Sequence, residues 1–127
     1  MVITIFVADM DRAVKFYTEI LGCQLQQRYG NHWAELKSDD GATIGLHPAS
    51  TQNPAGIKGS IQLGLEAKGS IHKQVEEMKS QGVKFVGPII DDQQVLIANF
   101  EDPDGNPLYL AALKQTTWTQ KPSAASN

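Results

Sequence analysis

Residues 2–25, "VITIFVADMDRAVKFYTEILGCQL", decide the fold, because a short β-branched run leads into an apolar helical stripe that ends at a glycine. The run at 2–7 predicts a strand. Asp9 is placed to cap the next helix, and Gly22 is a helix stop signal before a second strand. The apolar residues between them recur with the spacing of one helical face. They are Ala13, Phe16, Tyr17, Ile20 and Leu21.

The same order of elements returns in residues 60–85, "SIQLGLEAKGSIHKQVEEMKSQGVKF". Here we expect a strand, a helix capped by Ser70 and ended by Gly82, and another strand. Each half is followed by a hairpin with an Asp-Gly turn, "WAELKSDDGATIGL" at 33–46 and "IANFEDPDGNPLYL" at 97–110. One long repeat with the same element order indicates a duplicated module rather than an array of short repeats.

The composition excludes several classes of protein. The 127 residues fit one domain, and the net charge of −3 argues against a nucleic-acid partner. No apolar run approaches the roughly 20 residues of a membrane span. The chain begins in a strand-like run without the features of a signal peptide, and Cys23 is the only cysteine. A reducing, cytoplasmic location is therefore expected, with Cys23 as a small buried hydrophobic residue.

These patterns predict an α+β domain over 1–113, built from two βαβββ modules whose curved mixed sheets form a cleft. Module one is expected at 1–47, a linker with two prolines at 48–58, module two at 59–113, and a polar tail at 114–127. One face of each sheet packs under its helix. The other face must be covered by the second module or by a partner chain, which is a reason to expect a homodimer.

Three stretches resemble a known family in their order along 1–113: "VADMDRAVKFYTEILG", "GVKFVGPIIDDQQVLIANFEDPDGN" and "DPDGNPLYL". The chain resembles the vicinal-oxygen-chelate superfamily, which includes glyoxalase I, the bleomycin-resistance proteins and the extradiol dioxygenases. The resemblance implies paired βαβββ modules. It also implies a dimer, because small members commonly pair with their sites at or near the interface between chains.

The resemblance also locates a metal site, whose residues here are unusual. In the metal enzymes of the superfamily, His, Glu or Gln side chains stand at four strand positions that match Val2, Gly45, Ser60 and Tyr109. A divalent transition metal needs about three or four good donors at once. Val2 and Gly45 have none, a serine is a poor ligand, and a tyrosine must first lose its proton. We therefore expect neither a metal nor another cofactor.

Other potential donors lie near these positions in the sequence, at His47, Gln62, His32 and Glu35. We interpret His47 as a polar residue of the cleft wall, and His32 and His72 as surface side chains.

Strand alternation assigns the cleft side. Ile3, Ile5 and Val7, and in the second module Ile61, Leu63 and Leu65, are expected to pack inward, as are Ala34 and Leu36. The predicted ligand-binding residues then point into the cleft. They are Thr4, Phe6, Trp33, Glu35, His47, Gln62 and Tyr109. Aromatic rings offer stacking surface and the polar groups orient a ligand.

The leading hypothesis is a metal-free binding protein, similar to the bleomycin-resistance branch, which sequesters a hydrophobic or aromatic small molecule in the cleft between modules. Alternatively, Phe6 and Trp33 only fill the cleft as core. A second hypothesis is an enzyme, either a glyoxalase-like lyase or isomerase or an extradiol-type dioxygenase. A metal-free enzyme would use His47 and Tyr109 as an acid/base pair. A third is a regulatory module that binds a partner protein through an open sheet face.

Overall fold

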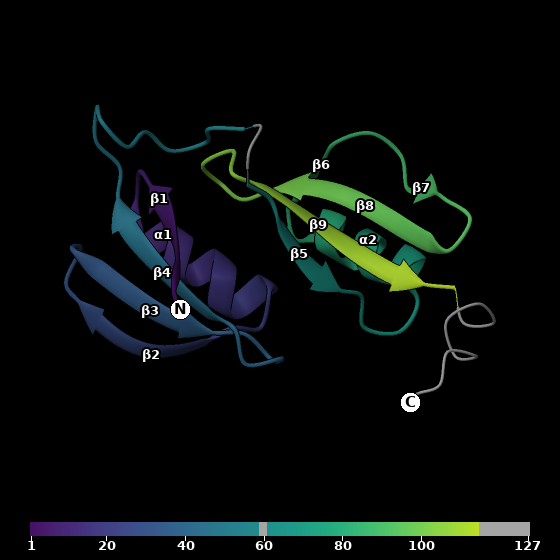
Figure 1. Ribbon diagram of the computed structural model, residues 1–127, viewed down its shortest axis with the longest axis horizontal. Coiled ribbons are helices and arrows are strands. Elements are labelled where there is room, and N and C mark those ends of the chain that lie inside the picture. The colour runs from purple at the N-terminus through teal and green to yellow at the C-terminus, as the bar shows by residue number, and fades with distance from the viewer. Residues whose placement is uncertain (59–60, 115–127) are drawn as a thin grey trace. The chain divides into compact units, whose positions relative to one another are not determined.

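The computed structural model describes residues 1–58 and 61–114, so Ser60 and most of the predicted tail lie outside the described residues. The chain divides into two compact units. The first is Met1–Gln62 with Glu101–Pro107, and the second is Leu63–Phe100 with the residues from Leu108 on. Each unit has one mixed sheet with helical structure on one of its faces (Figure 1). The predicted α+β fold of two βαβββ modules is confirmed.

The first unit contains a four-stranded sheet in the order β1-β4-β3-β2. Strands β1 and β4 are parallel, and the other neighbouring strands are antiparallel. The elements in chain order are β1 (Ile3–Val7), α1 (Met10–Lys15), the π-helical segment η1 (Phe16–Ile20), β2 (Gln24–Tyr29), β3 (Trp33–Lys37) and β4 (Thr43–Pro48).

Local sequence signals set the ends of the first helix as predicted. The carboxylate of Asp9 caps α1 by accepting a hydrogen bond from the backbone N–H of Arg12 at 3.0 Å. Gly22 stops the helical stretch with a φ of 78°, a left-handed conformation that glycine adopts easily. The helix passes directly into η1, a π-helical turn in which the consecutive aromatic residues Phe16 and Tyr17 are both buried.

The core of the first unit lies between the sheet and this helix. Alternation along the strands is confirmed, because the side chains of alternate residues on three strands are buried. They are Ile5 and Val7 on β1, Ala34 and Leu36 on β3, and Ile44 and Leu46 on β4. Ile3 begins β1 and stays 36% exposed, so it packs less than expected. Cys23 is buried, as predicted.

The second unit repeats the plan in a five-stranded sheet in the order β5-β9-β8-β6, with β7 paired to β8. Strands β5 and β9 are parallel, as β1 and β4 are in the first unit. The elements are β5 (Leu63–Glu66), α2 (Ile71–Ser80), β6 (Lys84–Phe85), β7 (Ile90–Asp91), β8 (Val95–Glu101) and β9 (Pro107–Leu113). The Ser70 hydroxyl caps α2 by accepting a hydrogen bond from the backbone N–H of Lys73 at 3.3 Å. The buried residues of α2 are Ile71, Val75 and Met78. No helix in the described ranges is long and apolar enough to cross a bilayer.

The prediction for the start of the second module was wrong in one respect. Ile61 was expected to pack inward, but it is 68% exposed and precedes β5. The pairing of β5 with β9 begins at Leu63 opposite Leu108. At the same register Ile61 would face Asn106, which lies in the loop before β9, so no strand is there to pair with it.

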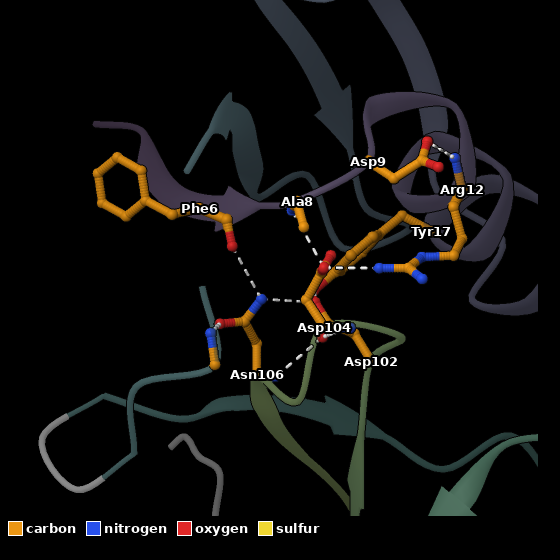
Figure 2. Close-up of polar contacts among 9 residues, drawn as sticks. Phe6, Ala8, Asp9, Arg12, Tyr17, Asp102, Asp104 and Asn106 are labelled. Carbon is orange, nitrogen blue, oxygen red and sulfur yellow. Dashed lines mark hydrogen bonds and ion pairs between the residues drawn. The ribbon is translucent and has the colours of Figure 1, made fainter. Parts of the chain in front are cut away.

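The loop that joins β8 to β9 belongs to the first unit, where Asp102 holds it by a buried network (Figure 2). Asp102 is only 4% exposed. One carboxylate oxygen accepts hydrogen bonds from the Tyr17 hydroxyl at 2.9 Å and the Asn106 side-chain amide at 2.8 Å. The other accepts from the backbone N–H groups of Asp104 at 2.9 Å and Asn106 at 2.8 Å. Four donors thus compensate the burial of this charge.

The same loop fixes the end of strand β1. The Asn106 amide also donates to the carbonyl of Phe6 at 3.1 Å, and Asp104 accepts from the backbone N–H of Ala8 at 3.0 Å. The Arg12 guanidinium pairs with the same Asp104 oxygen at 2.7 Å. Residues of the loop therefore contact the backbone on both sides of Val7 and restrain the segment that carries the Phe6 ring (Figure 2).

Replacing Tyr17 by Phe tests the network. Burial, followed by the charge of Asp102, raises the pKa of the Tyr17 hydroxyl well above its usual value, so the neutral hydroxyl is the donor. Tyr17→Phe leaves Asp102 short of one donor, and urea denaturation should show a loss of about 1–3 kcal/mol in the free energy of unfolding.

Tyr29→Phe is the matched control, because the Tyr29 hydroxyl is exposed and bonds only to the Gln27 side chain. We expect a change within about 0.5 kcal/mol. Equal effects of the two substitutions would contradict the role assigned to Tyr17.

Candidate functional site

The candidate site is the face of the first unit's sheet that is turned away from α1. Side chains that alternate with the buried ones lie on this face. We call the surface formed by Thr4, Phe6, Trp33, Glu35 and His47 the Trp33 face. Strand pairing sets Thr4 and Glu35 on either side of Gly45, and Phe6 opposite His47. All five residues were predicted from the sequence, and the structure brings them together on one face.

The indole of Trp33 covers Gly45. A methyl group built on Gly45 would lie 2.1 Å from Cη2 of Trp33, far inside van der Waals contact. Gly45 is buried although it has no side chain, because the ring of Trp33 lies where a side chain would stand. Any residue larger than glycine at this position would displace the indole from strand β4.

His47 lies beside two aromatic rings. Its imidazole is 5.8 Å from the Phe6 ring at an interplanar angle of 74°, and 6.4 Å from the Trp33 ring at 68°. Both are edge-to-face arrangements, which aromatic pairs favour. Nδ1 of His47 lies 2.9 Å from the carbonyl oxygen of Pro48. His47 itself is exposed.

Strand β2 adds residues that the sequence prediction missed. Gln27 pairs with Glu35, and Tyr29 pairs with Trp33, so both extend the Trp33 face. Tyr29 is 60% exposed, and its hydroxyl donates to the Gln27 side chain at 2.6 Å. The register of β2 shifts between Leu25 and Gln27. Such a bulge reverses the facing of the residues after it, and simple alternation cannot reveal it.

The second unit has a similar aromatic cover, described by itself. Tyr109 pairs with Gly64 across β9 and β5. A methyl group on Gly64 would lie 2.2 Å from Cζ of Tyr109, so the phenol lies across that strand. Gln62, another predicted site residue, is exposed just before β5. Because Tyr109 lies in the second unit, its place in a site with Trp33 stays a prediction.

Residues 2–110 match the model of the Glyoxalase/Bleomycin resistance protein/Dioxygenase superfamily. The chain belongs to this superfamily. No curated protein sequence matches the chain.

Solved structures agree with this assignment of the glyoxalase fold. TnmS3, an antibiotic binding protein from Streptomyces sp. CB03234, is 24% identical with a TM-score of 0.73, over 89% of this chain and 93% of that one. A glyoxalase/bleomycin resistance protein from the same strain is 25% identical with a TM-score of 0.67, over 86% and 96%. The integron cassette protein HFX_CASS4, from the mobile metagenome of Halifax Harbour sewage outfall, is 23% identical with a TM-score of 0.71, over 89% and 97%.

The positions matched to the superfamily's metal ligands are occupied as follows. Val2 is 45% exposed and precedes β1, Gly45 lies under the Trp33 ring, and Tyr109 lies over Gly64. Ser60 is outside the described residues. Within residues 1–58 and 61–114, no three His, Cys, Asp or Glu side chains gather closely enough to hold a metal ion. His32 and His72 are exposed, as predicted.

A double-mutant cycle tests the contact between Trp33 and Gly45. Gly45→Ala in the natural chain forces the indole away and should cost about 1–3 kcal/mol in the free energy of unfolding. In a Trp33→Ala background the same substitution meets open space. There alanine should be neutral or stabilising in the strand, because it loses less backbone freedom than glycine. Urea denaturation of the four proteins measures the coupling, and strictly additive effects would show that the two residues do not touch.

Proposed function

We propose that this protein binds a planar aromatic small molecule on the Trp33 face, without a metal ion or another cofactor. The observation that carries the proposal is the Trp33 indole over Gly45. An aromatic surface stands where the superfamily resemblance would put a metal ligand. Phe6 and Trp33 are each half-buried, so part of each ring is available for contact with a ligand.

The donors at the matched positions do not fit a transition metal. Val2 and Gly45 have no side-chain donor, and the indole adds no metal-binding atom over Gly45. A phenol such as Tyr109 binds a metal well only after it loses its proton. The described residues therefore offer less than the three or four donors that such an ion needs. This lack of fit supports binding rather than metal-dependent chemistry.

The polar groups of the Trp33 face suit a ligand that must be oriented as well as stacked. Glu35 is half-buried between Gly45 and Gln27 in the strand pairing, and His47 adds an exposed imidazole. A few polar groups in a mostly aromatic setting are typical of small-molecule sites. The similarity of the fold to TnmS3, which is described as an antibiotic binding protein, supports the same class of function.

The lyase, isomerase or dioxygenase alternative remains a prediction from the family, and no contact of the described residues favours it. The homodimer also remains a prediction, which light scattering of the purified protein measures directly. Gln62 and Tyr109 keep their predicted part in ligand binding.

Calorimetric titration with three planar probes of different charge tests the proposal: 2-naphthol, anthraquinone-2-sulfonate and 9-aminoacridine. Elemental analysis of the same sample measures bound metal. We expect at least one probe to bind the metal-free protein. A probe at 100 times its dissociation constant should raise the free energy of unfolding by about 2.7 kcal/mol. Zinc, nickel, iron or manganese at one ion per chain would overturn the metal-free proposal.

Substitutions at Trp33 locate the site. Trp33→Ala removes the stacking surface, and we expect affinity to fall roughly tenfold, the effect of about 1.4 kcal/mol. Trp33→Phe retains a flat ring and should keep most of the affinity. His72→Ala, at an exposed position of α2, is the control and should bind as the natural chain does. If Trp33→Ala bound the probe unchanged, the Trp33 face would not be the site.

A further inference from the structure

The hydrogen bond of His47 defines one chemical requirement for the ligand. Nδ1 lies 2.9 Å from the carbonyl oxygen of Pro48. A carbonyl oxygen only accepts hydrogen bonds, so Nδ1 must carry the proton and donate. In a neutral imidazole the other nitrogen, Nε2, then has a lone pair and acts as an acceptor.

The surroundings of His47 preserve this arrangement. The ring centroids of Phe6 and Trp33 lie 5.8 Å and 6.4 Å from the centroid of the imidazole. Turning the imidazole over would exchange Nδ1 with a carbon and break the bond to Pro48. Because His47 is exposed, a molecule that stacks on the neighbouring rings can approach its imidazole from solvent.

Glu35 adds a second acceptor to the same face. Its side chain is half-buried, and an ionised carboxylate has no proton to donate. Thr4, which pairs with Gly45 on the side opposite Glu35, can accept or donate. His47 and Glu35 thus both offer acceptors on this face. Only a ligand with an N–H or O–H group can form hydrogen bonds with them.

We propose that the ligand of the Trp33 face is an aromatic molecule that carries an O–H or N–H group, which donates to Nε2 of His47. This inference rests on the proposed function and specifies its ligand class. An analogue with the same rings and a methylated oxygen stacks equally well but leaves the acceptor without its partner. A site that uses such a hydrogen bond discriminates against the analogue.

The test compares 2-naphthol with 2-methoxynaphthalene by calorimetric titration in mildly alkaline buffer. We expect 2-naphthol to bind roughly threefold to tenfold more tightly, as one neutral hydrogen bond allows. In His47→Phe, which retains an aromatic ring but has no acceptor, the preference should vanish. His72→Phe is the control and should keep it.

The outcomes separate this inference from the proposed function. Equal affinity for both probes overturns the donor requirement but leaves aromatic binding intact. Failure of both probes to bind overturns both proposals for this class of ligand. A two-bond ¹H–¹⁵N correlation spectrum of the free protein gives an independent readout, because it shows which nitrogen of His47 is protonated. A proton on Nε2 instead of Nδ1 would also overturn the inference.

Discussion

The contact between the Trp33 ring and Gly45 is the constraint on which the candidate site depends. A glycine in the middle of a strand weakens it, since it loses more freedom on folding and packs no side chain. Here the indole from the neighbouring strand covers the bare backbone and buries it. The same contact sets the ring beside His47. Tyr109 and Gly64 make a comparable contact in the second unit.

A second constraint acts on the end of strand β1, which carries Thr4 and Phe6. The loop between β8 and β9 returns to the first unit, where Asp102 accepts four hydrogen bonds and Asn106 reaches the carbonyl of Phe6. Removing one partner of a buried carboxylate costs more than an average hydrogen bond contributes. The strand that carries Thr4 and Phe6 is therefore held by a part of the chain nearly a hundred residues away. The buried core of this sheet, the aromatic contacts of the Trp33 face and the β8–β9 loop all belong to the first unit.

Much of the fold follows from local signals. The caps at Asp9 and Ser70, the stop at Gly22 and the alternation of Ala34 and Leu36 predicted the elements and their buried faces, because these depend on near neighbours in the chain. The bulge that turns Gln27 and Tyr29 onto the Trp33 face, the exposure of Ile61 and the Asp102 network were not predictable. Each depends on the register with a distant strand or on a long-range hydrogen bond. Residue types at the site were predictable, but the tautomer of His47 required its contact with Pro48.

We propose that aromatic rings, and not a metal ion, form the binding surface at Gly45. The most direct measurement follows the Trp33 indole and Gly45 amide signals by NMR while zinc, and then 2-naphthol, is added. We expect 2-naphthol to shift both signals in a saturable way and zinc to leave them in place. Saturation of those shifts at one zinc ion per chain, with no response to 2-naphthol, would contradict it.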